Sequence, residues 1–150
     1  EISAILGLDQ SYKMVVVGVG NLGTAIANHT SYYKTGFVID GVFEVSPSLI
    51  GTQINGVTVQ DYENVVNFVE ENNTDIGIIC TGKEVAQEVA DRLCFAGVRG
   101  IWNFAPVDIE VPDYVALENV HISDSLHSLA YHMNMRKKAE AEKLKKAQNK

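Results

Sequence analysis

The chain has 150 residues, of which 46% are apolar and 21% charged, and its formal net charge is −7. This length and composition are typical of one globular domain with a sizeable core, which excludes bulk disorder and a second large domain within these residues. No apolar run approaches the roughly 18 residues of a membrane-spanning helix, and no secretory signal opens the chain, so a cytoplasmic protein without a membrane partner is expected.

The charge is unevenly distributed along the chain. From Arg136 onward there are seven basic and two acidic side chains, whereas the preceding residues hold five basic and 17 acidic ones. An acidic body of this kind is a poor nucleic-acid surface by itself. The lysine-rich end is typical of a solvated helix terminus, with contact to an acidic partner as the alternative.

Apolar strands and amphipathic helices alternate in the predicted order of elements. Strands are expected at 13–17, 37–45, 57–59, 75–80, 100–104 and 115–122, and helices at 22–29, 61–72, 84–96 and from 123 onward. Gly97 is a C-terminal helix stop, and Ser123 and Asp124 are candidate N-caps of the last helix. Strands alternating with helices indicate βαβ units and a parallel sheet.

The first strand-to-helix turn has the pattern G-x-G-x-x-G, formed by Gly18, Val19, Gly20, Asn21, Leu22 and Gly23. The first glycine permits the tight turn, the second lets a pyrophosphate approach the backbone, and the third lets helix and strand pack closely. The helix N-terminus then directs N–H groups and a partial positive charge at phosphate. The chain is therefore expected to be an α/β protein with a Rossmann-type, doubly wound, mostly parallel sheet and a long C-terminal helix.

An acid is expected at the end of the second strand, where it would bind the adenosine ribose. Glu44 occupies that place, followed by Val45 and by Ser46, whose hydroxyl could add a contact. A carboxylate there favours NAD(H) because it repels the 2′-phosphate of NADP(H). Asp40 is the competing ligand, although it falls in mid-strand.

Two further turns follow later strands and are expected at the same edge of the sheet. Thr81, Gly82 and Lys83 would border the nucleotide, since Glu84 stands where a phosphate-binding P-loop needs Ser or Thr. The next turn would place an amide, a ring and a rigid bend against the nicotinamide: Asn103, Phe104, Ala105 and Pro106.

Groups for catalysis or metal binding are not evident in the pattern. The four histidines and the cysteines Cys80 and Cys94 lack metal-ligand spacing, so buried thiols are expected. A nicotinamide-dependent enzyme needs a general acid–base and substrate anchors beside the ring. The chain is therefore expected not to be an enzyme; the alternative is the nucleotide-binding lobe of an oxidoreductase or of a CoA-ligase-type enzyme.

Several segments in colinear order resemble Rex, the bacterial redox-sensing transcriptional repressor family. They are residues 17–28, 88–93, 96–98, 103–106 and 128–131. The resemblance implies that 1–10 end a linker, that 11–122 form the domain binding NADH and NAD⁺, and that 123–150 form a helix exchanged in a homodimer. It also implies a winged-helix domain, absent here, that binds operator DNA and is loosened by NADH.

The chain departs from the Rex pattern at three positions. His29 stands where a tyrosine is expected, His121 where an acid is expected, and Ile122 where an aromatic residue faces the partner's nicotinamide. These departures concern the switch between states and leave the expected nucleotide site unchanged.

Overall fold

The structure is a computed structural model that describes residues 11–29 and 34–149. It divides into two compact units, Glu1–Val120 and His121–Lys150. The linker predicted at 1–10 lies outside the described residues.

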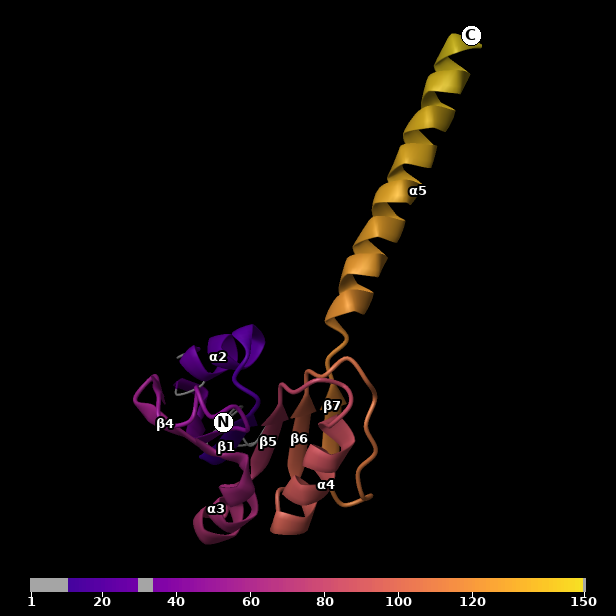
Figure 1. The fold of residues 1–150 in the computed structure, drawn as a ribbon. Coiled ribbons are helices and arrows are strands. Elements are labelled where there is room, and N and C mark those ends of the chain that lie inside the picture. The colour runs from indigo at the N-terminus through magenta and orange to yellow at the C-terminus, as the bar shows by residue number, and fades with distance from the viewer. Residues whose placement is uncertain (1–10, 30–33, 150) are drawn as a thin grey trace. The chain divides into compact units, whose positions relative to one another are not determined.

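A seven-stranded sheet forms the first unit (Figure 1), in the order β3-β4-β2-β1-β5-β6-β7. All neighbouring strands are parallel except β3 and β4, as the expected doubly wound sheet requires. The strands are β1 Tyr12–Val17, β2 Phe37–Glu44, β3 Gln53–Ile54, β4 Val57–Asp61, β5 Ile76–Ile79, β6 Gly100–Asn103 and β7 Ala116–Asn119.

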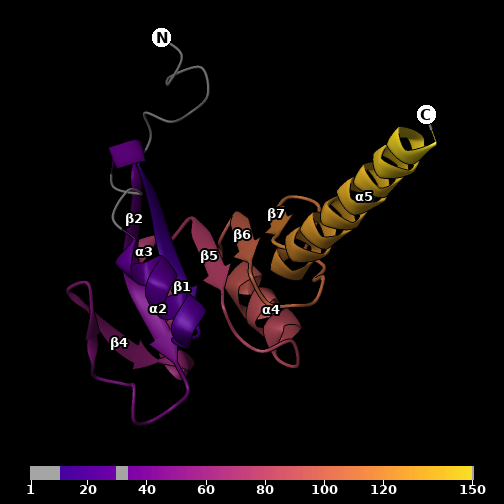
Figure 2. The same ribbon diagram turned by 90° about the horizontal axis from the view of Figure 1, so that it is seen from above.

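Helices cover the sheet from both faces (Figure 2), with α2 on the face opposite α3 and α4. They are α2 Asn21–Asn28, the short 3₁₀ helix η2 Tyr62–Asn64, α3 Val65–Asn72 and α4 Ala86–Ala96. The stop predicted at Gly97 is confirmed, because this residue is the C-cap of α4 with φ 119°; the C-cap of α3 is Asn73 with φ 52°. Both residues take the left-handed conformation that ends a helix.

The strands β1 and β5 are almost continuously apolar because both of their faces are buried. Val15 and Val17 pack with α3 and α4, whereas Met14, Val16 and Ile78 pack on the α2 face. This burial on both faces explains why these strands appear in the sequence as apolar runs rather than as alternating patterns.

The segment after β2 differs from the prediction. A loop with one short strand was expected, but β3 and β4 form an antiparallel hairpin in which Gln53 pairs with Thr58 and Ile54 with Val57. Its turn is Asn55-Gly56, and both residues have positive φ (51° and 80°). This is the Asn-Gly sequence that two-residue hairpin turns favour.

The second unit contains α5, Ile122–Gln148. The prediction that Ser123 and Asp124 cap this helix is wrong, because it begins at Ile122 with His121 at the N-cap and no side-chain cap. Among the described residues, no helix is both long and apolar enough to span a membrane. Several apolar side chains of α5 are exposed, namely Leu126, Leu129, Tyr131, Met133, Met135 and Leu144.

Candidate nucleotide-binding site

The turn between β1 and α2 is shaped by two glycines that the fold itself requires. Gly18 has φ +101°, and a Cβ there would lie 2.7 Å from the carbonyl oxygen of Cys80. A Cβ on Gly23 would collide with the carbonyl oxygen of Gly18. The close packing of helix and strand that the motif predicts is thereby confirmed.

Gly20 is different because nothing in the protein requires a glycine there. Its φ is −77°, an ordinary value for any residue, and no atom lies within 4 Å of where a Cβ would stand. Gly20 is the N-cap of α2, and no side chain caps this helix. Bare backbone and the first-turn N–H groups therefore face open space, as an anion-binding helix terminus does.

The Glu44 side chain, at the end of β2, folds back onto the same turn. One carboxylate oxygen, Oε1, accepts a hydrogen bond from the N–H of Val19 at 2.9 Å; Oε2 accepts from Val45 (2.6 Å) and Ser46 (2.9 Å). Burial would raise the pKa of Glu44, but these three hydrogen bonds outweigh it and hold the pKa below its ordinary value. Glu44 is therefore an ionised acceptor beside the glycine turn.

A cavity of about 450 Å³ lies along the carboxyl ends of β1, β2 and β5. Six of the sequence-predicted site residues line it: Gly18, Gly20, Glu44, Val45, Thr81 and Gly82. Val19 and Ser46 contribute through their hydrogen bonds to Glu44, while Asn21 and Leu22 lie exposed in the first turn of α2. The ligand contact predicted for the exposed Lys83 stays a prediction.

Sequence reasoning missed the far end of this cavity, which is lined by η2 and α4. The Arg92 guanidinium lies 4.9 Å from the ring centroid of Tyr62 and 3.1 Å from Glu88 Oε1. Val85 and Val89 complete this end. The i,i+4 spacing of Glu88 and Arg92 was a usable signal for their ion pair. No local pattern links Arg92 to Tyr62, which lies thirty residues earlier on another element.

The turn predicted to meet the nicotinamide lies after β6 and is held by Asn103. This side chain is fully buried; Nδ2 donates to Val107 O and Asn119 Oδ1, both at 2.8 Å, and Oδ1 accepts from the N–H of Ala105 at 3.0 Å. The Asn103 amide therefore holds the turn. Its hydrogen bonds are made within the protein and not, as the sequence had suggested, to a ligand.

Phe104 and Pro106 are the accessible members of that turn, whereas Ala105 is buried. The Phe104 ring packs at 4.6 Å, centroid to centroid, against Trp102. Contact of this turn with a nicotinamide stays a prediction.

Asp40 does not line the cavity. It is the extra residue of a β-bulge, because Met14 pairs with Ile39 and Val15 with Gly41. Within the described residues, no three His, Cys, Asp or Glu side chains gather as metal ligands. Both cysteines are free, and burial raises the pKa of the Cys80 thiol to about 12. His29 and His121 are exposed, and the side chain of Ile122 is not described.

Comparison with known proteins identifies the family. Residues 9–107 match the model of the CoA binding domain family. The redox-sensing transcriptional repressor Rex of Thermoanaerobacter sp. (strain X514) is 51% identical over 89% of this chain, which spans 59% of that protein.

Solved structures of RSP, a Rex-family repressor, are similar to this chain over more than nine-tenths of its length. The crystal structure of RSP in complex with β-NADH is 49% identical, with a TM-score of 0.87, over 93% of this chain and 68% of that one. The complex of RSP with β-NAD⁺ and operator DNA is 48% identical, with a TM-score of 0.88, over 95% of this chain and 65% of that one. Residues 9–107 of the chain belong to the CoA binding domain family. The chain as a whole belongs to the Rex family of redox-sensing transcriptional repressors.

Proposed function

We propose that this chain is the NAD(H)-sensing regulatory domain of a bacterial transcriptional repressor. The observation that carries the proposal is that the described part of the fold does not require a glycine at position 20, because a Cβ there would meet no atom of it. A side chain at this N-cap would stand in open space, where the diphosphate of a dinucleotide would otherwise meet main-chain N–H groups. Gly20, Asn21 and Leu22 would supply those donors.

Glu44 would hold the adenosine ribose and set the choice of cofactor. Its carboxylate is ionised and fixed by three N–H donors, which leave about one of its roughly four lone-pair sites to accept a hydrogen bond from a ribose hydroxyl without rearrangement. A 2′-phosphate would meet this negative charge, which favours NAD(H) over NADP(H). Thr81, Gly82 and Lys83 would border the diphosphate, with Phe104 and Pro106 beside the nicotinamide.

The expected output is a change of state rather than turnover. The oxidised nicotinamide carries a positive charge that the reduced ring lacks, so an apolar surrounding such as that of Phe104 penalises NAD⁺. A ligand shifts a two-state protein only through its different affinities for the two states, and about 3 kcal/mol corresponds to more than a hundredfold. RSP is described with β-NADH and also with β-NAD⁺ and operator DNA, which supports NADH as the ligand that loosens the repressor.

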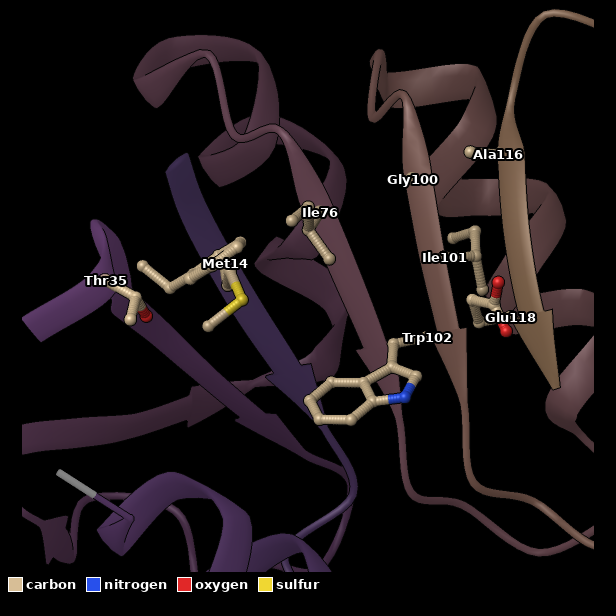
Figure 3. Close-up of a pocket in the computed structure, with 9 residues that line it drawn as sticks. Met14, Thr35, Ile76, Gly100, Ile101, Trp102, Ala116 and Glu118 are labelled. Carbon is tan, nitrogen blue, oxygen red and sulfur yellow. The ribbon is translucent and has the colours of Figure 1, made fainter. Parts of the chain in front are cut away.

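A homodimer formed through α5 would cover apolar surface that a single chain leaves exposed. A cavity of about 420 Å³ on the sheet is lined mostly by apolar side chains, among them Met14, Ile76 and Trp102, together with Thr35 and Glu118 (Figure 3). Apart from Thr35, its lining residues come from β2, β1, β5, β6 and β7, whereas the contacts of α2 with the sheet are to β1 and β3. A parallel sheet is normally covered on both faces.

A second copy would cover that apolar face of the sheet with its own α5. Leu126, Leu129 and Met133 follow each other at helical spacing and are exposed, so they form one apolar stripe that also needs a partner surface. Operator DNA would be bound through a winged-helix domain outside these residues, in the bacterial cytoplasm, and no enzymatic activity is expected.

Calorimetric titration of the purified chain tests the proposal. NADH should bind one site per chain, tighter than NAD⁺ and far tighter than NADPH. Equal affinity for NADPH would overturn the role of Glu44, and absence of all dinucleotide binding would overturn the proposal. Coenzyme A is the necessary comparison because of the family of residues 9–107. The 3′-phosphate of coenzyme A would meet the negative charge of Glu44, so we expect it to bind more weakly than NADH. Tighter binding of coenzyme A than of NADH would favour the alternative of a CoA-ligase-type lobe.

A further inference from the structure

The groups that line the 450 Å³ cavity belong to only one half of a dinucleotide site. Gly18 and Gly20 would face the diphosphate and Glu44 the ribose, while Tyr62 and Arg92 lie at the far end of the cavity. None of residues 103–106, the turn predicted for the nicotinamide, is among the described residues that line this cavity. The preformed part of the site therefore has the extent of an adenosine diphosphate.

The far end has the chemistry of a purine pocket. Tyr62 is only 7% exposed, its hydroxyl is buried, and its ring lies under the Arg92 guanidinium. The partly exposed Arg92 guanidinium offers a planar cation on which a purine can stack, and the buried Tyr62 ring beneath it holds that cation in place. Burial raises the pKa of Tyr62, more than the nearby positive charge of Arg92 lowers it, so the hydroxyl keeps its proton.

The nicotinamide side offers fewer polar groups. Both Nδ2 hydrogens of Asn103 are donated within the protein, and its Oδ1 accepts from Ala105. Phe104 can give only contact with its ring. Most hydrogen bonds and charges available to a dinucleotide are therefore concentrated on its ADP half, and an ADP compound without the nicotinamide would keep them.

We propose that adenosine 5′-diphosphate compounds that lack nicotinamide, with ADP-ribose as the best fit, bind this same site and compete with NADH and NAD⁺ alike. The inference rests on the proposed dinucleotide site and adds a second class of ligand. ADP-ribose has the diester charge of the dinucleotide, whereas ATP adds negative charge to a cavity that already holds Glu44, Glu63 and Glu88. We therefore expect ADP-ribose to bind tighter than ATP.

Competition of this kind would change how the domain responds to redox state. A competitor at concentration [I] multiplies the apparent dissociation constant of NADH by 1 + [I]/Ki. The NADH concentration needed to half-saturate the chain would then depend on the concentration of ADP compounds, although these compounds are neither oxidised nor reduced.

The test is calorimetric titration of the full chain with ADP-ribose, NADH and nicotinamide mononucleotide, followed by titration of NADH into chain presaturated with ADP-ribose. We expect ADP-ribose to bind within about tenfold of NADH, to displace it competitively, and nicotinamide mononucleotide not to bind. If NADH binds but ADP-ribose is more than about a hundredfold weaker, or binds without competing, the inference fails and the proposed function stands. If neither binds, both fail.

Matched arginine variants locate the binding. Arg92→Met should weaken ADP-ribose and NADH in parallel, by about tenfold each. Arg99→Met is the control, because Arg99 lies over the Tyr114 ring at 5.0 Å in an equivalent pair away from the cavity, and both affinities should be unchanged. If Arg92→Met weakens NADH alone, the shared purine pocket is wrong. Circular dichroism of each variant establishes that it is folded.

Discussion

The Glu44 carboxylate accepts a hydrogen bond from the N–H of Val19 at 2.9 Å, which joins the end of β2 to the glycine turn after β1 across 25 residues of sequence. The same side chain accepts from the next two main-chain N–H groups. A single acid therefore fixes the turn that would receive a diphosphate and faces the place where a ribose would lie. The proposed binding role of Glu44 and its structural role would therefore be lost together.

Replacement of Glu44 by Gln should lower both stability and cofactor discrimination. Because the pKa of Glu44 is lowered by folding, its contribution is present above the ordinary glutamate pKa and is lost as pH falls through the folded pKa. We expect Glu44→Gln to cost about 1 kcal/mol at pH 7, and the two proteins to become equally stable in acid. Urea unfolding at pH 7 and at a series of lower pH values measures this; a stability difference that does not shrink as pH falls below the ordinary glutamate pKa would contradict it.

The glycines of the turn should separate folding from binding. Gly20→Val has open space for its side chain, so the protein should fold with a loss of no more than about 1 kcal/mol and bind NADH at least about a hundredfold more weakly. Gly23→Ala should instead cost about 3 kcal/mol, because its methyl group meets the Gly18 carbonyl. Thermal unfolding and calorimetry distinguish the two. Retained NADH affinity in Gly20→Val would show that the diphosphate lies elsewhere.

Asp40 should be a destabilising residue at neutral pH. Burial raises the pKa of this carboxyl more than its backbone hydrogen bond and Lys13 lower it, and its Oδ1 is buried with no hydrogen-bond partner. The folded chain therefore holds the proton more tightly than the unfolded chain, and stability falls as pH rises from the unfolded to the folded pKa. Asp40→Asn should stabilise the protein at pH 7, by no more than about 1 kcal/mol after allowance for solvent screening. The gain, measured by thermal unfolding, should vanish near pH 3; a stability loss at pH 7 would refute this.

The cysteines should be inert in the folded protein. The thiolate is the reactive form, and burial raises the pKa of Cys80 to about 12 and also raises that of Cys94. An aromatic disulfide reagent at pH 8 should therefore label both thiols far more slowly in the native chain than in urea. Bound NADH should slow the labelling of Cys80 further, since this residue lines the cavity. Rapid labelling of Cys80 in the native chain would point to direct thiol sensing instead.

One substitution on the α5 stripe should dissociate the proposed dimer. Leu129→Asp puts a charge into the apolar surface that a second copy would cover, so light scattering at micromolar concentration should give half the mass of the parent. Ser128→Asp is the matched control: it adds the same charge to the adjacent exposed position, which points away from the stripe. A monomeric parent chain, or equal dissociation of both variants, would be evidence against α5 as the interface.

The strands, the glycine turn and the acid beside that turn could be predicted from the sequence because each depends on local pattern. Apolar runs fix β1 and β5, and Glu44 is placed by its distance from the turn. The β3–β4 hairpin also had a local signal, Asn55-Gly56, but two-residue strands are too short for periodicity to mark them.

The end of the cavity at Tyr62 and Arg92 could not be predicted, because it depends on tertiary packing. Tyr62 and Arg92 meet only after α4 packs beside η2 and α3, and neither residue type is unusual at its place. Asn103 shows that a sequence pattern can also suggest a ligand contact where the side chain has a structural role. A polar residue at the carboxyl end of a strand is typical of a ligand contact, yet its hydrogen bonds close a turn inside the protein.

Trp102 is the one tryptophan of the chain, and it packs against Phe104, beside the expected place of the nicotinamide. Reduced nicotinamide absorbs light at the wavelengths where indole emits, and oxidised nicotinamide does not. Excitation energy would therefore pass from Trp102 to NADH but not to NAD⁺. The chain would then serve, without any attached dye, as an optical gauge of which form it holds.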